Sequence, residues 1–282
     1  MAAGEDPRRT LARHGLAAKK SWGQNFLRDR AVLARIAAAT QAGPDDVVVE
    51  IGAGLGALTH ALNDLVPPPA RVVAIDRDPD MLAVLQAEVA SDRVEVRAAD
   101  AAHFDFVAEA RRVGRPLVVV GNLPYQIASA LILSVLEAGR DGAVSRAVVM
   151  IQREMAKRIT APPGSRVYGR LTVAVAQSAE AAILFDVKPG SFHPAPAVTS
   201  SVLRLIPRAA PLAPVKDRAL FEEVVKRAFS TRRKMLRRAL ADFGDQRTAA
   251  ALAAAGLAGT ERAEELSVAA FARLADAFAA TS

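Results

Sequence analysis

A glycine-rich segment at residues 50–56, EIGAGLG, follows an apolar run rich in β-branched residues and precedes a helix-like stretch. Glycines at such a turn let a ligand lie against bare backbone. The spacing G-x-G-x-G differs from the dinucleotide pattern G-x-G-x-x-G, and no P-loop Lys-Ser/Thr follows it. Glu50, before Gly52 and Gly54, would repel a pyrophosphate but suit a cationic amino-acid group. A glycine-rich turn that binds nothing is the alternative.

Two acidic residues stand where further strand patterns stop. Asp76 follows Gly52 by 76 − 52 = 24 residues, a spacing at which a carboxylate commonly accepts hydrogen bonds from ribose hydroxyls. Asp100 could accept a bond from the exocyclic amine of an adenine, whereas the alternatives are a solvated turn for Asp76 and a helix N-cap for Asp100. Taken with the glycines, they describe a pocket for an adenosine-containing ligand without phosphates, which S-adenosylmethionine fits.

The segment Asn122-Leu123-Pro124-Tyr125 closes another strand pattern and suggests the reaction. An exocyclic amine on a base is a poor nucleophile because its lone pair is delocalised into the ring. An Asn side-chain oxygen and a nearby backbone carbonyl could each accept one N–H bond and direct the lone pair toward a methyl group. Pro124 would fix the turn, and Tyr125 would offer a face for stacking a base. A strand-ending turn with one aromatic residue is the alternative.

The elements that must position these residues alternate along the chain. Strands are predicted at 45–54, 70–78, 93–100, 115–125 and 146–152, with helices at 56–65, 79–90 and 128–139, and with a helix, a strand or both at 171–187. This order predicts a doubly wound α/β domain with a mostly parallel sheet, whose ligands bind at the carboxyl ends of the strands. We expect this domain to cover residues 1–206, a Pro/Ala-rich linker 207–214, and a small all-helical domain 215–282.

Composition narrows the class of protein. Hydrophobic residues make up 51% of the 282 residues, and Lys plus Arg exceed Asp plus Glu by 37 − 30 = 7. A basic chain is consistent with a nucleic acid or another anionic partner, although charge alone does not establish one. The absence of cysteine excludes disulfides, Cys-ligated zinc, iron–sulfur clusters and thiol catalysis, and fits a cytoplasmic protein. We expect no secretory signal and no membrane span.

Basic residues concentrate in a predicted helix of the C-terminal domain, where we expect RNA phosphate contacts. They are Arg227, Arg232, Arg233, Lys234, Arg237 and Arg238. Helical spacing would place Lys234 with Arg238, and Arg233 with Arg237. Residues 1–20 are expected to form a second, flexible basic arm. The histidines are scattered without a partner at ligand spacing, so we expect no metal.

In its motifs the chain resembles the ribosomal RNA adenine N6-dimethyltransferases over nearly its whole length, and most of all the members that act on small-subunit RNA. Residues 19–27 (KKSWGQNFL) resemble the family's N-terminal cofactor motif, residues 50–56 its glycine motif, and residues 122–125 its catalytic N-L-P-Y. Residues 191–200 resemble its F-x-P-x-P-x-V-x-S segment, and residues 168–171 and 232–234 also match.

The resemblance implies a Rossmann-like methyltransferase fold that binds S-adenosylmethionine, and it implies a role for each matching residue. Asn25 and Leu27 would close the cofactor pocket and Gly52 would pack against the methionine part. Asp76 would hold the ribose hydroxyls and Asp100 the adenine. The remaining implied roles are the target amine for Asn122 and a second aromatic wall, opposite Tyr125, for Phe192.

Two residues depart from the family pattern. Asp76 stands where Glu is frequent, which could change the affinity for the cofactor. Trp22 stands where Leu or Phe is usual, and we expect it to fill the core rather than to alter the lid of the pocket.

The implied reaction is N6,N6-dimethylation of two adjacent adenines in the 3′-terminal hairpin of small-subunit RNA, within an immature small subunit, by a monomer. The rival interpretations are a resistance-type methyltransferase for large-subunit RNA, a non-catalytic RNA-binding assembly factor, and a nicotinamide-dependent oxidoreductase.

Overall fold

The computed structural model describes residues 5–19, 22–124, 126–231 and 233–281. The chain divides into two compact units. A sheet unit comprises Met1–Ala156 and Ala182–Pro207, and a helical unit comprises Lys157–Ala181 and Arg208–Ser282. Among the described residues, no helix is long and apolar enough to cross a membrane.

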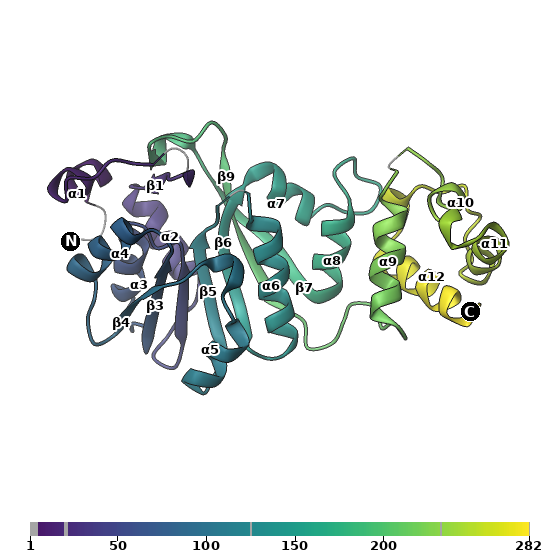
Figure 1. Cartoon of the computed structure of the whole chain (residues 1–282), viewed down its shortest axis with the longest axis horizontal. Coiled ribbons are helices and arrows are strands. Elements are labelled where there is room, and N and C mark those ends of the chain that lie inside the picture. Colours follow the sequence, from purple (N-terminus) through teal and green to yellow (C-terminus); the bar gives the residue numbers. More distant parts are fainter. Residues whose placement is uncertain (1–4, 20–21, 125, 232, 282) are drawn as a thin grey trace. The chain divides into compact units, whose positions relative to one another are not determined.

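A seven-stranded sheet forms the centre of the sheet unit, in the order β4-β3-β2-β5-β6-β9-β7 (Figure 1). The strands are β2 (Val47–Ile51), β3 (Arg71–Asp76), β4 (Val94–Ala98), β5 (Leu117–Asn122), β6 (Val144–Gln152), β7 (Ala179–Val187) and β9 (Ser200–Pro207). Neighbours from β4 to β6 pair in parallel, and β9 pairs antiparallel to β6. The five strands predicted from the sequence are therefore confirmed, and the segment 171–187 contains both a helix and a strand.

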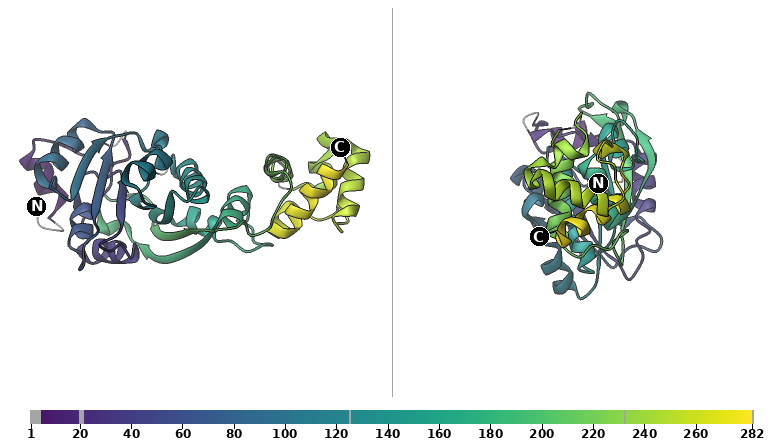
Figure 2. Two further views of the ribbon diagram at one scale, coloured as in Figure 1. Left: turned by 90° about the horizontal axis from the view of Figure 1, so that it is seen from below. Right: turned by 90° about the vertical axis from the view of Figure 1, so that its right-hand side faces the viewer.

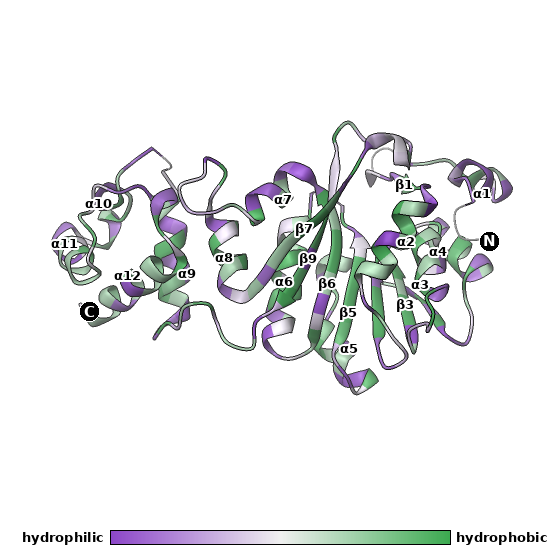
Figure 3. Cartoon of the chain, turned by 180° about the vertical axis from the view of Figure 1, so that it is seen from behind, coloured by the Kyte–Doolittle hydropathy of each residue, from purple (hydrophilic) through white to green (hydrophobic). Residues whose placement is uncertain are grey.

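The central strands are hydrophobic because both faces of the sheet are covered. Every residue of β2 is buried, and green hydrophobic colour runs along β5, β6 and β9 in Figure 3. The helices of this unit are α1 (Pro7–Arg13), α2 (Arg30–Ala39), α3 (Ala57–Asn63), α4 (Pro79–Glu88), α5 (Phe106–Val113), α6 (Ala128–Arg140) and α7 (Arg153–Ile159), the last of which ends inside the helical unit. Leu33 of α2, Leu62 of α3 and Leu85 of α4 pack with strand residues in one core cluster.

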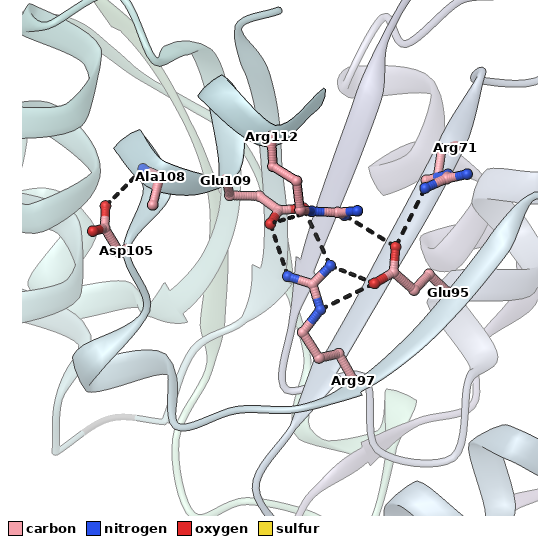
Figure 4. Close-up of polar contacts among 7 residues, drawn as sticks. All are labelled: Arg71, Glu95, Arg97, Asp105, Ala108, Glu109 and Arg112. Carbon is pink, nitrogen blue, oxygen red and sulfur yellow. Dashed lines mark hydrogen bonds and ion pairs between the residues drawn. The ribbon is translucent and has the colours of Figure 1, made fainter. Parts of the chain in front are cut away.

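A network of charged side chains ties α5 to the outer strands β3 and β4 (Figure 4). Glu109 of α5 is only 4% exposed and pairs with Arg97 at 2.8 Å and Arg112 at 2.7 Å. Glu95 contacts the same two arginines and Arg71. Burial alone would raise the pKa of Glu109, but the hydrogen bonds from Arg112 and Arg97 outweigh it and hold the pKa at about 2. The network therefore fastens α5 to the edge strand β4, which ends two residues before Asp100.

The N-terminal segment is not the flexible arm that the sequence predicts. Within it, Pro7–Arg13 form α1, which Asp6 caps by accepting a hydrogen bond from the N–H of Arg8. Leu11 is 4% exposed and packs with Met81 and Val84 of α4. Arg13 forms an ion pair with Glu88 at 2.7 Å. An apolar face and an ion pair to α4 thus hold the segment against the sheet unit.

The helical unit contains α8 (Arg170–Ser178), α9 (Arg218–Ala228), α10 (Leu236–Ala239), α11 (Asp245–Ala254) and α12 (Val268–Ala280). Helices α9 and α11 pack against α12 (Figure 2). The core of the unit gathers the rings of Phe271 and Phe278 from α12 with that of Tyr168, and Phe229 lies between Tyr168 and Phe271 at ring distances of 6.0 and 5.7 Å.

The observed division of the chain differs from the predicted boundary in two places. Residues 157–181 belong to the helical unit, since α8 contributes Val173 and its neighbours to that core. The predicted linker 207–214 is fastened to α8 by the buried amide of Gln177, which donates to the Ala213 carbonyl at 2.6 Å and accepts from the Ala213 N–H at 3.1 Å. A Pro/Ala-rich composition indicates a connection but not whether the connection is packed.

Candidate functional site

A pocket of ≈ 280 Å³ lies in the sheet unit at the carboxyl ends of β2, β3 and β5. Most of the predicted site residues line it, namely Asn25, Leu27, Glu50, Gly52, Gly54, Asp76, Asp100, Asn122, Leu123 and Pro124. Parallel strands bring their carboxyl ends to one edge of the sheet, which is why residues far apart in the sequence converge here. Tyr125 lies outside the described residues.

The glycine segment forms the floor between β2 and α3. Gly52 and Gly54 have φ angles of +66° and +56°, in the left-handed region that other residues rarely adopt. A Cβ on Gly54 would lie 3.2 Å from the ring of Phe26, so a side chain there would be crowded as well as strained. The N–H of Gly54 donates to Asp76 at 2.9 Å. The segment thus both makes room for a ligand and orients a carboxylate of the site.

Glu50 is 2% exposed and its carboxylate accepts a hydrogen bond from the Thr59 hydroxyl at 2.6 Å. Burial raises the pKa of Glu50 to about 8, and the nearby negative charge of Asp76 contributes to the rise. A buried carboxylate in this position would be stabilised in its ionised form by a cationic ligand group, as the sequence suggests.

Asp76 ends β3 and accepts two backbone hydrogen bonds, from Gly54 and from Asp78, each at 2.9 Å. Burial raises its pKa. Each carboxylate oxygen has further lone pairs, so both can still accept a hydroxyl proton from a ligand. The shorter Asp side chain is therefore held rigidly by the backbone at the edge of the pocket.

Asp100 is both a helix N-cap and a residue of the pocket, the two possibilities that the sequence left open. Its side chain caps the 3₁₀ turn at Ala101–His103, accepting from the N–H of Ala102 at 2.9 Å, and it also lines the pocket. Capping uses Oδ1, while Oδ2 lies 3.6 Å from Nδ1 of the exposed His103 and keeps lone pairs for a ligand amine.

The N-terminal motif and the 191–200 segment meet in a short two-stranded sheet. Strand β1 (Phe26–Leu27) pairs antiparallel with β8 (Phe192–His193), so Leu27 lies opposite Phe192. Phe192 is 3% exposed and packs in the core with Leu27 and Leu33, and its ring does not line the pocket. Its predicted role as an aromatic wall is not supported by this position; the ring would have to leave the core to meet a base.

The expectation that Trp22 fills the core is wrong. Its side chain is 38% exposed and lines the pocket, where Lys19 and Arg77 lie over its ring at 5.2 and 4.7 Å from the centroid. Two cations on one indole favour a surface position because each ammonium or guanidinium keeps part of its hydration there. Trp22 thus forms part of the pocket wall beside the strand end that carries Asp76.

Asn122, the last residue of β5, is oriented by the N-terminal motif. Its Nδ2 donates to the backbone carbonyl of Asn25 at 3.3 Å. This bond leaves the amide oxygen of Asn122 as the acceptor on the other side, with no partner among the described residues. Leu123 follows with its side chain 2% exposed and its N–H bonded to Met150, while Pro124 is exposed. The next two residues thus hold the turn in place around this acceptor.

The charges of the pocket fit S-adenosylmethionine. Its described lining contains the carboxylates of Glu5, Glu50, Asp76 and Asp100 against one cation, that of Arg77. A phosphate would be repelled by this set, whereas a sulfonium and an ammonium would be attracted. Among the described residues, no group of three His, Asp or Glu side chains could hold a metal ion.

The predicted RNA-binding residues do not share a helix. Arg233 and Lys234 lie in a turn before the one-turn helix α10, which contains Arg237 and Arg238, and Arg232 lies outside the described residues. All four described side chains are exposed, and none forms an ion pair within the described part of the chain. We call Arg233, Lys234, Arg237 and Arg238 the basic loop. Arg227 differs from them because Glu223 and Asp242 pair with it at 2.6 and 3.1 Å.

Sequence reasoning missed three polar residues that hold the pocket together, Gln24, Arg77 and Asp78. Asp78 is 1% exposed and pairs with Lys19 at 2.7 Å. The available signal was the D-x-D spacing of Asp76 and Asp78 at the end of the predicted strand 70–78.

The chain is similar to known proteins over nearly its whole length. The family model described as ribosomal RNA adenine dimethylase matches residues 15–280. The ribosomal RNA small subunit methyltransferase A of Anaeromyxobacter dehalogenans (strain 2CP-C) is 46% identical over 281 residues, covering 95% of this chain and 96% of that protein. The protein of the same name from Methylobacterium radiotolerans is 48% identical over 287 residues, covering 95% and 91%.

Solved structures show the same fold. The 23S rRNA methyltransferase ErmE has 29% sequence identity and a TM-score of 0.68, covering 90% of this chain and 99% of its own. A dimethyladenosine transferase from Plasmodium falciparum, at 24% identity, has a TM-score of 0.71 and covers 88% and 95%. The chain is a Rossmann-like α/β protein with a helical C-terminal region, and it belongs to the ribosomal RNA adenine dimethylase family.

Proposed function

We propose that this protein is an S-adenosylmethionine-dependent methyltransferase that converts adenine to N6,N6-dimethyladenine in small-subunit ribosomal RNA. We further propose that its targets are two adjacent adenines in the 3′-terminal hairpin, presented by an immature small subunit to a monomer of the enzyme. The observation that carries the proposal is the amide of Asn122, held by the Asn25 carbonyl at the edge of a pocket lined by carboxylates.

The cofactor, when bound, supplies an electrophilic methyl group on a sulfonium. In this proposal Asp76 accepts hydrogen bonds from the ribose, Asp100 accepts one from the adenine amine, and Glu50 meets the cationic amino-acid group. The support is that all three line the pocket. Because Gly52 lacks a side chain, its backbone is open to the methionine part of the cofactor. These residues bind and orient; none of them needs to form a covalent bond.

The described residues of the 122–125 turn act on the target amine. The oxygen of Asn122 accepts one N–H bond, and a backbone carbonyl of the turn accepts the second, which draws the nitrogen toward a tetrahedral geometry and exposes its lone pair. Such preorganised acceptors lower the barrier because they are fixed before the reaction begins. Tyr125 and Phe192 are proposed as the walls that stack the extruded base, and Phe192 must turn out of the core to do so. Bases in loops are extruded at lower cost than paired ones.

RNA binding is assigned to the basic loop of the helical unit, together with Arg232. Its exposed cations release counterions when they meet phosphates, which makes affinity depend strongly on salt. Sequence identity favours the small subunit as the substrate. The two small-subunit relatives are 46% and 48% identical to this chain, whereas the 23S rRNA methyltransferase ErmE is 29% identical.

The test is methyl transfer from labelled S-adenosylmethionine to small ribosomal subunits that lack the modification, with large subunits in parallel and the labelled base mapped. Dimethyladenine in the 3′-terminal hairpin of the small-subunit RNA is the expected product. Label only in large-subunit RNA would move the chain to the resistance-type branch. Cofactor binding with no label in either subunit, at several stages of assembly, would support a non-catalytic RNA-binding factor instead.

A further inference from the structure

We propose that Asp78 is a positioning residue for methyl transfer. Through Gln24, it couples Asp76, the carboxylate proposed to bind the cofactor ribose, to the amide of Asn122. This inference rests on the proposed function, because it assigns a role to Asp78 within the same site. Asp78 does not line the pocket, so its effect has to pass through the residues that it holds.

The carboxylate of Asp78 is almost completely buried, and both of its oxygens accept hydrogen bonds. Its side chain is 1% exposed. Oδ1 accepts hydrogen bonds from the Lys19 ammonium at 2.7 Å and from the N–H of Asp80 at 3.1 Å, which caps α4. Oδ2 accepts from Nε2 of Gln24 at 2.7 Å. A buried charge is costly unless it is paired, so these donors are held firmly.

On one side, Asp78 fixes the cofactor carboxylate. Its backbone N–H donates to Oδ1 of Asp76 at 2.9 Å, while Oδ2 of Asp76 accepts from Gly54. The position of Asp76 thus depends on the turn that Asp78 stabilises.

On the other side, Asp78 fixes the segment that orients the reacting amide. Both ends of the Gln24 side chain are bonded, because its Oε1 accepts the N–H of Lys19 at 2.9 Å while its Nε2 donates to Asp78. The next residue, Asn25, offers the carbonyl that accepts Nδ2 of Asn122 at 3.3 Å. A short path of hydrogen bonds and one peptide unit therefore links Asp76 to Asn122.

A helix cap alone does not account for this arrangement. Capping α4 requires only Oδ1, whereas the bond to Gln24 uses Oδ2 and leads away from the helix. The two roles can be separated by changing one oxygen. In Asp78→Asn the amide oxygen can still accept the hydrogen bonds from the Lys19 ammonium and from the N–H of Asp80. The new amide nitrogen, however, faces Nε2 of Gln24, and two donors cannot form a hydrogen bond with each other.

A compensating change restores the pairing. In Gln24→Glu the new carboxylate can still accept the Lys19 N–H, but alone it would face the carboxylate of Asp78. Combined with Asp78→Asn, it accepts a hydrogen bond from the new amide nitrogen, and the net charge of the pair is unchanged. Each single variant thus breaks the link, and the double variant rebuilds it with the donor and acceptor exchanged.

The experiment compares wild type, both single variants and the double variant by calorimetric titration with S-adenosylmethionine, by kcat on unmethylated small subunits, and by melting temperature. We expect each single variant to raise the cofactor Kd about tenfold and to lower kcat about tenfold. In the double variant, both quantities should return to within about threefold of the wild-type values. Asp80→Asn is the matched control: Asp80 also contacts Lys19, at 2.6 Å, but is 43% exposed, so less than about a twofold change is expected.

Lower melting temperatures in both single variants, with Kd and kcat unchanged below the transition, would reduce Asp78 to a structural cap and overturn the inference. A double variant no better than the worse single variant would overturn it as well. Failure of the wild type itself to bind the cofactor would instead refute the proposed function. Binding and methylation by wild type with normal single variants would refute the positioning role alone.

Discussion

The pocket of the sheet unit and the basic loop of the helical unit use charge in opposite ways. In the pocket, Glu50 and Asp76 are buried and bonded to the chain itself. In the basic loop, Arg233 and Lys234 are exposed and have no acidic partner within the described residues. The pocket holds its carboxyl groups in place before a ligand arrives, whereas the loop leaves its cations free to meet one.

This difference predicts two kinds of response to substitution. A fixed group contributes through its geometry, so its loss should change the rate or the affinity for one ligand and depend little on salt. A free cation contributes through its field, so its loss should change RNA affinity in a salt-dependent manner and leave the cofactor site intact. Substitutions in the two regions separate these responses, beginning with the largest expected effect.

Asn122→Ala should lower kcat by about a thousandfold or more, because it removes an acceptor aimed at the target amine. The cofactor Kd, measured by calorimetry, should change by less than about threefold, since the amide faces the amine rather than the ribose. Asn122→Asp is a useful companion, because it keeps an acceptor but loses the donor to the Asn25 carbonyl. Turnover by Asn122→Ala at the wild-type rate would remove the amide from the mechanism.

Replacing the four described residues of the basic loop by Glu should weaken small-subunit RNA binding by roughly several hundredfold at physiological salt, and each lost phosphate contact should flatten the slope of log K against log salt by about 0.9. Cofactor affinity should stay at the wild-type value. The double variant Arg227→Glu with Glu223→Arg is the control, because Arg227 and Glu223 already form an ion pair with each other at 2.6 Å. An unaltered salt slope in the fourfold variant would place the RNA surface elsewhere.

Glu50→Gln should make the cofactor-free protein more stable than the wild type at high pH. The pKa of Glu50 in the folded state is about 8, against an ordinary value of 4.5, so the folded state holds a proton that the unfolded state has lost between these values. Stability of the wild type therefore falls as pH increases from about 4.5 to about 8, by up to about 5 kcal/mol. Gln, which cannot ionise, removes this loss.

The measurement is the melting temperature of wild type and Glu50→Gln at about pH 5 and about pH 8. The variant should gain at the higher pH and match the wild type at the lower. Glu109→Gln serves as the opposite case: its pKa is held at about 2, so its stabilising charge is present above about pH 4.5 and is lost as pH falls toward 2. Equal curves for wild type and Glu50→Gln would mean that Glu50 stays ionised in the fold.

Asp76→Ala should raise the cofactor Kd by about thirtyfold, because it removes the proposed ribose acceptor and leaves the N–H groups of Gly54 and Asp78 without a partner. Asp76→Glu restores the residue that the family frequently has and should remain within about threefold of the wild type. Calorimetry with S-adenosylmethionine and with its demethylated product checks both. Normal affinity of Asp76→Ala for both ligands would contradict the ribose assignment.

Trp22→Leu should raise the cofactor Kd only about two- to threefold, because Trp22 contributes an exposed wall stabilised by two cation–π contacts. Trp22 is also the one tryptophan of the chain, so its fluorescence reports this position alone. Saturating cofactor should change the emission of the wild type. Unchanged emission at saturation, together with normal affinity of Trp22→Leu, would exclude Trp22 from the wall.

The sequence indicated the sheet and most of the site because both depend on short-range patterns. The β-branched runs that end at Glu50, Asp76 and Asn122 predicted three strands, and parallel pairing obliges their carboxyl ends to meet at one edge. Residue types then suggested the chemistry, since a pocket with acidic side chains and no P-loop excludes a phosphate-rich ligand.

The sequence was less informative where exposure decides the outcome. Trp22 is apolar enough for a core position, yet Lys19 and Arg77 hold it at the surface. Basic residues near 233–238 have helical spacing, yet a turn precedes the four-residue α10. An N-terminal segment rich in charge has no long apolar run, yet Leu11 packs with residues of α4. Each of these results depends on neighbours that are distant in the chain.

What the sequence alone determined is the set of elements and the residue types at their ends, because local periodicity and backbone propensity act over a few residues. What only the tertiary structure decided is how those ends are joined. Gln24 reaches Asp78 across 54 positions, and Asn122 reaches Asn25 across 97. Such bonds form because burial leaves a polar group no water to bind, so it must find a partner wherever the fold brings one.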